Sequence, residues 1–465
     1  MADQQGRFLT GSTMGHVVRM TATGATGITF VFLVDAANLF WISKLGDPLL
    51  MAAIGFAFAI QFFTVSIGVG MMIATTAIVS RSVGAGELAQ AREQATSATV
   101  MTFVVQALTA LVVVALREPL LRLAGAEDEA LRLASRYLAL SLPSLAIMAV
   151  GLCGSAALRA VGDGARAMYI TLSGGFTAML LDPVLIYGLG LGLDGAAFGI
   201  WVFRCVMAFV ALWFCIRAHD LLARPNLPAV RQTAPRFAAV ALPAILTQMA
   251  APAGNYLLTG VIAGFGDAAV AAWAVINRLT VVAYGGLFSL AGAIGGIFGQ
   301  NYGAKLYDRL RSTYRDAVIF CVIYALVTWA LLVAVSGAVA DGFGLSGEAA
   351  QILRAFTHVG AGGFVFAGLL FVCNAAFNTL GRPTRASVLN WIKETALMWP
   401  AALWLADPFA AQGVVYAQAL VGALVGLLAV VWGWRYVQAI GHQITPSVDL
   451  GTRRAYRDVN RYRRR

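Results

Sequence analysis

The sequence predicts an all-α polytopic membrane protein whose twelve transmembrane helices form two pseudo-symmetric bundles of six. The first observation is composition: 60% of the 465 residues are hydrophobic and only 12% are charged, whereas about a quarter of the residues of a soluble domain are charged. The second is a series of uncharged runs of about 20 residues, enough to cross ~30 Å of hydrocarbon. The third is that the second half of the chain repeats the first.

The apolar runs are predicted to be helices. In the bilayer core the backbone must satisfy its own hydrogen bonds, so only helices and closed barrels cross it. Barrel strands would be alternating segments of about ten residues, and the runs here are longer and continuous. The predicted spans of the first half are 18–42, 49–79, 96–116, 134–156, 167–190 and 195–217. Those of the second half are 237–263, 269–298, 316–340, 353–378, 387–407 and 413–437.

Basic residues follow the even-numbered spans, and the opposite connections are short or acidic. Arg81 follows the second span, Arg166 the fourth, Arg231 the sixth and Lys305 the eighth. Because basic loops stay in the cytoplasm, this distribution places both termini on the cytoplasmic side of the inner membrane. The net charge of +11 and the arginine-rich end of the chain are interpreted as a topology signal or a lipid contact, not as nucleic-acid binding.

Three motifs recur at a nearly constant distance, which identifies an internal repeat. The paired positions are Gly46 and Gly266, Gly84 and Gly303, and Gly162 and Gly381, which are 219 or 220 residues apart. Because six spans is an even number, both halves enter the membrane in the same orientation and should be related by an axis along the membrane normal.

The repeat divides the chain into a first bundle, 1–217, and a second, 237–437. A proline-containing cytoplasmic linker, 218–236, joins them, and a basic cytoplasmic tail covers 438–465. Tandem repeats of this kind are typical of secondary transporters, which bind substrate between the repeats and work by alternating access. The sequence therefore predicts a transporter.

Two carboxylates lie in the middle of apolar spans. Asp35 is deep in the first span and Asp182 is in the fifth. A charge at the centre of a membrane helix costs about 2.5–3.5 kcal/mol on insertion scales, so such residues are candidates for function. Pro183 should leave the carbonyl of Met179 without its helical partner, and a carboxylate beside a free carbonyl can bind a proton or a small cation. The alternative for either acid is a structural hydrogen bond between helices.

Other polar residues are weaker candidates. Asn38 lies one turn after Asp35 on the same face. Cavity-lining or interhelical roles are open for Gln61, Gln248, Asn255, Asn374 and Asn378. By the repeat offset, Asn255 is the counterpart of Asp35 and Ala401 that of Asp182. The carboxylates are therefore confined to the first half. Structural roles are favoured for the remaining intramembrane charges, which include Arg204, Arg278, Lys393 and Glu394.

Enzyme chemistry has little support. The five cysteines form no CxxC pair and are predicted to be buried packing residues. The four histidines are scattered, and there is no HExxH or Walker A sequence. No catalytic residue, metal site or cofactor is predicted, and a membrane-embedded enzyme is the least favoured alternative.

Several short motifs, in this order and spacing, resemble the multidrug and toxic compound extrusion (MATE) family, within the multidrug, oligosaccharidyl-lipid and polysaccharide exporter group. They extend over nearly the whole chain and are Leu33-Val34-Asp35, Ser80-Arg81-Ser82-Val83-Gly84-Ala85-Gly86, Leu158-Arg159-Ala160-Val161-Gly162-Asp163, Leu181-Asp182-Pro183 and Gly299-Gln300-Asn301-Tyr302-Gly303-Ala304.

The resemblance implies a V-shaped pair of bundles that exports cationic, amphipathic compounds in exchange for protons or sodium ions. Asp35 and Asp182 fall on the two acids that one branch of the family uses for coupling. Two neutral ligand positions of that branch are Ala178 and Ile200 here, so a proton is favoured over sodium. We expect a monomer whose partners are the lipid bilayer and small cationic substrates. A sodium-coupled exporter and a flippase of a lipid-linked saccharide are the alternatives.

Overall fold

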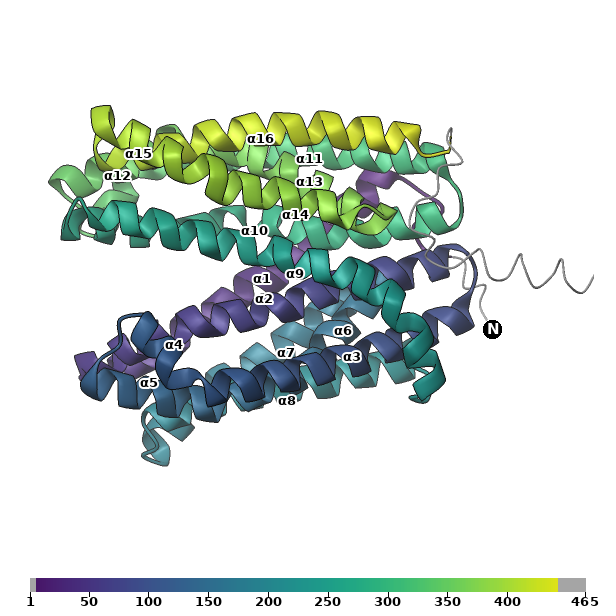
Figure 1. Ribbon diagram of the computed structural model, residues 1–465, viewed down its shortest axis with the longest axis horizontal. Coiled ribbons are helices and arrows are strands. Elements are labelled where there is room, and N and C mark those ends of the chain that lie inside the picture. Colours follow the sequence, from purple (N-terminus) through teal and green to yellow (C-terminus); the bar gives the residue numbers. More distant parts are fainter. Residues whose placement is uncertain (1–5, 442–465) are drawn as a thin grey trace, which may run out of the picture.

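The computed structural model describes residues 6–441 and is built almost entirely of helices (Figure 1). The helices of the first half are α1 (Thr13–Ser43), α2 (Pro48–Gly84), α3 (Leu88–Ala115), α4 (Arg117–Leu123), α5 (Asp128–Ser141), α6 (Leu145–Val161), α7 (Gly164–Pro183) and α8 (Leu193–Trp213). Those of the second half are α9 (Leu227–Ala263), α10 (Asp267–Gly303), α11 (Tyr307–Gly342), α12 (Gly347–His358), α13 (Phe364–Leu380), α14 (Pro383–Trp391), α15 (Met398–Phe409) and α16 (Ala411–Ala439).

The helices form two lobes that meet at the end near the N-terminus and part at the opposite end (Figure 1). The first lobe holds α2 to α8 and the second α10 to α16. Helices α1 and α9 run between them: α1 packs on α10 and α7, and α9 packs on α2 and α14. Because α9 and α10 are the repeat counterparts of α1 and α2, the two crossings are equivalent. The predicted pair of pseudo-symmetric bundles is confirmed.

The predicted spans correspond to helical segments along the whole described chain. Eleven segments within residues 6–441 are individually long and apolar enough to cross a membrane. The remaining predicted span, 387–407, lies in α14, a π-helical turn at Ile392–Leu397 and α15. That segment contains Lys393 and Glu394, whose side chains form an ion pair, which explains why it is less apolar than the others.

The predicted linker is shorter in the structure than in the sequence interpretation. Helix α9 begins at Leu227, inside the segment 218–236, because Pro228 occupies the first turn, where a missing N–H costs nothing. Of the basic tail, the structure describes the residues up to 441, and the rest lie outside the described part of the chain.

The glycines that mark the repeat end equivalent helices. Gly162 caps α6 at φ +92° and Gly381 caps α13 at φ +97°. This left-handed conformation is open to glycine and strained for most other residues. The same residue therefore stops the same helix in each lobe.

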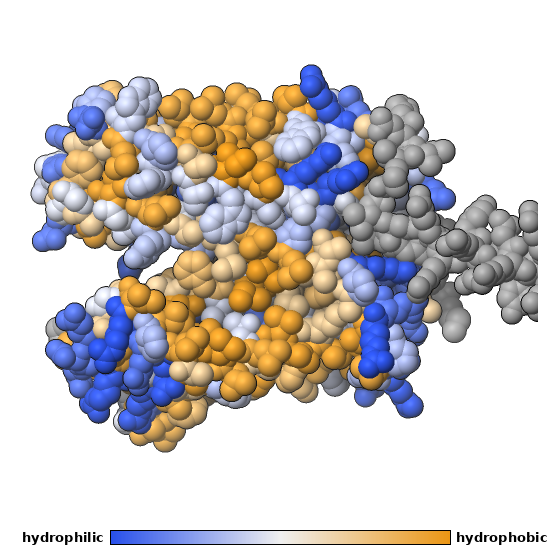
Figure 2. Space-filling view, in the orientation of Figure 1, coloured by the Kyte–Doolittle hydropathy of each residue, from blue (hydrophilic) through white to orange (hydrophobic). Residues whose placement is uncertain are grey.

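Each lobe has its own apolar core, and large apolar side chains also cover the outer surface of both lobes (Figure 2). Such a surface suits lipid contact and not water. Four of the five cysteines are buried and Cys205 is exposed. The prediction of buried packing is therefore wrong for Cys205, which lies on an exposed part of the α8 surface.

Candidate functional site

Asp182 is the more enclosed of the two intramembrane acids. It lies near the end of α7 and only 1% of its surface is exposed. Asn38 Nδ2 on α1 donates a hydrogen bond of 2.9 Å to Asp182 Oδ2. The other carboxylate oxygen, Oδ1, is buried without a hydrogen-bond partner. A buried acceptor in this state is costly when charged, so Asp182 favours neutralisation by a proton or a cation.

Glycine at position 199 makes room for this carboxylate. A Cβ built on Gly199 of α8 would lie 2.0 Å from Asp182 Oδ1, which is far inside van der Waals contact. Beyond Asp182, α7 ends at Pro183 and continues as a π-helical turn, Val184–Gly188. Turns of this kind are frequent at functional sites.

Asp35 lies on α1 about one turn before Asn38, and its side chain is exposed. It interacts electrostatically with Arg204 on α8. Tyr137 on α5 interacts with Arg204, Asp35 and Asp182. Tyr137 and Arg204 are buried in the first lobe, so Asp35 interacts with buried groups of this lobe although it is itself exposed. The structure thus brings the two predicted acids into one electrostatic cluster with a buried guanidinium.

Arg204 is held by a break between α5 and α6. Its Nη1 donates to the carbonyl of Ser141 at 3.2 Å and to the hydroxyl of Ser144 at 2.7 Å. A short 3₁₀ turn that includes Pro143 separates the two helices here, so the carbonyl of Ser141 is available to an outside donor. Only 5% of Arg204 is exposed. The guanidinium is a positive charge held in place near Asp35, and Tyr137 links it to Asp182.

Two further candidates, Gln61 and Met179, also lie in the first lobe. Gln61 is buried and its Nε2 donates to the Ser141 hydroxyl at 2.7 Å, which is an interhelical bond on the edge of the Arg204 site. Met179 is half-buried on α7. Gln61 therefore supports the scaffold of the cluster.

The candidates in the second lobe lie apart from this cluster. Asn390 Nδ2 donates to Asn374 Oδ1 at 3.0 Å, and Asn378 Oδ1 is buried without a partner. Gln248 is half-buried and Asn255 is exposed, both on α9. The structure therefore does not unite the candidates of the two halves into one cluster.

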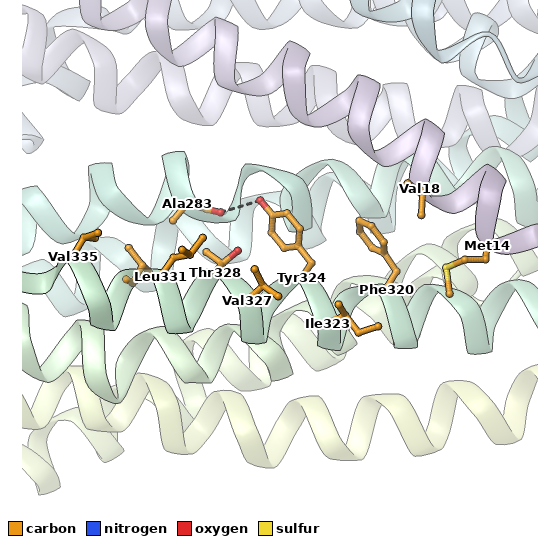
Figure 3. A pocket seen from close by; sticks show the side chains of 11 residues that line it. Met14, Val18, Ala283, Phe320, Ile323, Tyr324, Val327, Thr328, Leu331 and Val335 are labelled. Atoms are coloured by element: carbon orange, nitrogen blue, oxygen red, sulfur yellow. Dashed lines mark hydrogen bonds between the residues drawn. The ribbon is translucent and has the colours of Figure 1, made fainter.

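Two hollows are visible on the surface. Figure 2 shows a cleft between the lobes at the end opposite the N-terminus. A separate apolar groove of about 820 Å³ lies between α1, α10 and α11 (Figure 3), where Tyr324 donates a hydrogen bond to the carbonyl of Ala283. Its lining includes Met14, Val18 and Phe320, and none of its lining residues is an acid. The groove is thus distinct from the carboxylate cluster.

Sequence reasoning missed Tyr137 and gave Arg204 little weight. A tyrosine in an amphipathic helix is usually a packing residue, so nothing in the local pattern identified it. Arg204 did carry a signal, because an arginine within an apolar span needs a partner. The partner groups, Ser141 and Ser144, lie about 60 residues away in sequence and could not be assigned without the fold.

Comparison with known proteins agrees with this architecture. The MatE family model matches residues 25–184 and 243–400, one segment in each half. The chain is 25% identical to the FAD transporter of Shewanella oneidensis, over 92% of this chain and 95% of that protein. It is 24% identical to the multidrug export protein MepA of Staphylococcus saprophyticus, over 52% and 54% of the two chains.

A similar solved structure is the crystal structure of the D35N mutant of the Vibrio cholerae MATE transporter VcmN. It superposes with a TM-score of 0.87 at 25% identity, covering 92% of this chain and 98% of that one. The family match extends over most of the chain, and the helical bundles agree with it. The chain belongs to the MATE family of multi-pass membrane transporters.

Proposed function

We propose that this transporter exports cationic, amphipathic compounds in exchange for protons. The observation that carries the proposal is the buried, unpartnered Oδ1 of Asp182 in a cluster with Asp35 and Arg204. Protonation would neutralise this carboxylate, and deprotonation would restore a charge that favours a bound cation. Competition between a proton and a cationic substrate for the same negative charge is sufficient to produce exchange.

Arg204 adjusts the charge of the cluster. With both acids ionised, the guanidinium compensates one of the two negative charges, so the cluster carries a net charge of about −1. A single proton then makes it neutral. We therefore infer that one proton is exchanged per cycle at this cluster, although two carboxylates are present.

A proton is favoured over sodium by the surroundings of Asp182. Hard cations need several oxygen ligands. On one side Asp182 Oδ1 lies against Gly199, and residues 178 and 200 are alanine and isoleucine, which offer no side-chain oxygen. Sodium coupling remains the alternative that the experiment below distinguishes.

A second candidate function is export of an anionic compound such as a flavin dinucleotide. The likeness to the FAD transporter of Shewanella oneidensis and the buried positive charge of Arg204 both favour it. When both acids are protonated, the cluster carries the charge of Arg204 alone, which attracts an anion. The two candidates thus differ in which protonation state binds substrate.

The experiment is transport in proteoliposomes, with ethidium and FAD as separate substrates and imposed proton or sodium gradients. The proposal expects ethidium transport driven by the proton gradient and abolished by Asp35→Asn. FAD transport without ethidium transport would replace the first candidate by the second. Ethidium transport driven only by sodium would contradict proton coupling.

We further propose that the protein lies in the cell membrane with both termini in the cytoplasm, as the basic loops require. The cleft between the lobes would then open to the outside. Tags attached after Arg465 and near Arg231 should both be reached only from the cytoplasmic side. Labelling of either tag from outside intact cells would contradict this orientation.

A further inference from the structure

Helices α2 and α10 cross where the two lobes meet. A Cβ on Gly84 would lie 2.0 Å from the carbonyl oxygen of Gln300, and a Cβ on Gly303 would lie 2.1 Å from that of Arg81. The contact has two-fold character, because Gly303 and Gln300 each follow their counterparts, Gly84 and Arg81, by 219 residues. Only glycine permits this approach, so the lobes are in backbone contact at this end.

Two side chains, Arg81 and Gln300, donate hydrogen bonds between the lobes at the same place. Arg81 Nε donates to the carbonyl of Thr379 at 2.6 Å, and its Nη2 donates to the same oxygen. Gln300 Nε2 donates to the carbonyl of Ala160 at 2.6 Å. Both acceptors lie in the last turn of a helix, α13 or α6, where carbonyls lack a helical partner. The acceptors are also 219 residues apart, so the two bonds are repeat-related.

The segment that precedes α1 is inserted beside this crossing. Phe8 is 1% exposed and its N–H donates to Gln300 Oε1 at 2.9 Å. A Cβ on Gly162 would lie 3.1 Å from Phe8 Cζ, and one on Gly296 would lie 3.4 Å from Phe8 Cε2. Gly162 belongs to the first lobe and Gly296 to α10 of the second. The ring therefore lies between the lobes.

The backbone of this segment is attached to the second lobe. Arg309 on α11 donates to the carbonyl of Phe8 at 2.8 Å, of Thr10 at 3.2 Å and of Gly11 at 3.0 Å. On the first lobe, the Phe8 ring and the Arg7 side chain pack against Gly162, and Arg7 Nη1 makes a longer hydrogen bond, 3.4 Å, to the carbonyl of Gly162. The segment should therefore stay with the second lobe when the lobes part.

We propose that residues 6–11 form a wedge and that Arg81 and Gln300 form a paired latch, which together hold this end of the transporter closed. For the lobes to separate at this end, the ring of Phe8 must leave its position against Gly162, and the hydrogen bonds of Arg81 and Gln300 must break. The inference rests on alternating access, but it concerns which contacts close one end, not which ion drives transport.

The first test measures closure directly, without transport. Thr76, 6% exposed on α2, is replaced by cysteine as a reporter, together with Cys205→Ala to remove the exposed native thiol. A membrane-impermeant thiol reagent is applied to the side of the membrane that carries the N-terminus. We expect Arg81→Gln to raise the labelling rate at least about fivefold, because the loss of each hydrogen bond accounts for about that factor, and Phe8→Ala to raise it by at least about tenfold.

Thr10→Ala is the matched control within the wedge, because the Thr10 side chain is exposed and makes no hydrogen bond among the described residues. It should leave the labelling rate within about twofold of the reporter alone. Equal rates for Phe8→Ala and Thr10→Ala would overturn the wedge. A reporter that reacts equally fast with and without the Arg81→Gln substitution would overturn the latch.

The second test requires no change in the wedge. A Cβ on Gly295 would lie 3.7 Å from Thr76 Cγ2, so the side chains of Thr76→Cys and Gly295→Cys face each other across the crossing and are chosen as the pair for a disulfide cross-link. Oxidation should reduce ethidium or FAD transport by at least about tenfold, and a reductant should restore it. Transport at the unlinked rate after complete cross-linking would show that this end need not open. If the unlinked protein transports neither substrate, the proposed function fails, while the labelling test still decides the wedge and latch.

Discussion

In the first half of the chain, α1 and α7 carry Asp35 and Asp182 within apolar spans; in the second half, the equivalent positions on α9 and α15 are Asn255 and Ala401. The helices themselves take matching places, since α1 packs on α7 as α9 packs on α14. Both lobes must pack at the same crossing and separate from it, so the two halves keep the same arrangement of helices. On the proposed function, only one lobe needs to bind a proton or a cation, so the charged residues are free to differ.

The largest expected effect comes from Asp35→Asn, which keeps the size and hydrogen-bonding capacity of the side chain but fixes it neutral. Proton-driven efflux should fall by at least about a hundredfold, because the charge that a proton and a cationic substrate share is lost. The measurement is dye efflux at matched expression over a range of pH. Asp182→Asn should weaken efflux or shift its pH dependence.

Asn255→Asp, combined with Asp35→Asn, tests whether the lobes are interchangeable. We expect no recovery, because the surroundings of Asn255 differ: the counterpart of Asp182 in the second half is Ala401, and the carboxylate that lies against α9, Glu394, is already paired with Lys393. Recovery to within about tenfold of the unmodified rate would mean that a carboxylate in either lobe suffices. An unchanged rate and pH profile for Asp35→Asn alone would make Asp35 structural.

Gly199→Ala should have the next largest effect, because the added methyl group collides with Asp182 Oδ1. Displacing the carboxylate should lower efflux about tenfold and destabilise the protein by about 1–3 kcal/mol. Gly27→Ala is the matched control, since a Cβ there meets nothing within 4 Å. Efflux and thermal unfolding in detergent test both variants. Wild-type efflux for Gly199→Ala would mean that the exact position of Asp182 is unimportant.

The two halves also differ at the residue that follows the capping glycine of α6 and of α13. This residue is Asp163 in the first half and Arg382 in the second. Burial raises the pKa of the Asp163 carboxyl, but three hydrogen bonds outweigh this effect and hold the pKa below its ordinary value. His219 donates one at 2.8 Å, and Arg166 donates the others, from its backbone N–H at 3.1 Å and from its side chain at 2.5 Å. The ionised carboxylate therefore stabilises the fold above the unfolded pKa of about 3.9, and this contribution is lost as pH falls through the lower folded value.

Asp163→Asn should accordingly lower the free energy of unfolding by about 1–2 kcal/mol at pH 7, with a difference that shrinks below about pH 4. Asp308→Asn is the control, because Asp308 also pairs with an arginine three residues away but its side chain is 97% exposed. A pH-independent difference for Asp163→Asn would indicate packing and not charge. Thermal unfolding at several pH values measures it.

The smallest effect is expected in the second lobe. Asn378→Ala removes a buried amide whose Oδ1 has no partner, so little bonding energy is lost. Efflux should stay within about threefold of the unmodified rate with the same pH profile. A shifted pH profile would place part of the coupling in the second lobe and weaken the contrast between the halves.

The sequence was sufficient to predict the spans and the repeat and to single out two acids within apolar spans as candidates, because each of these depends on local length, spacing or the cost of a charge in lipid. Contacts between distant segments could not be predicted in this way. Phe8 is an apolar residue in a polar stretch with no helical period around it, and only the fold brings it to Gly162. Tyr137 and the Ser141 carbonyl likewise join the cluster through tertiary packing. The short helix α4 and the π-helical turns also carry no distinct sequence signal.

The crossing of α2 and α10 also bears on how such a chain could arise. Thr76 faces Gly295, Ser80 faces Gly299, and Gly84 faces Gln300, while Gly303 faces Arg81. In each case a residue meets its own counterpart from the other repeat or a near neighbour of it, which is the pattern of a self-complementary interface in a two-fold dimer. A six-helix ancestor that paired with a second copy of itself, with both copies inserted in the same direction, would present this interface. Gene duplication and fusion would then have allowed the second copy to lose the carboxylates equivalent to Asp35 and Asp182, while a change of any small residue at the crossing would still have required a matching change in the residue that it contacts.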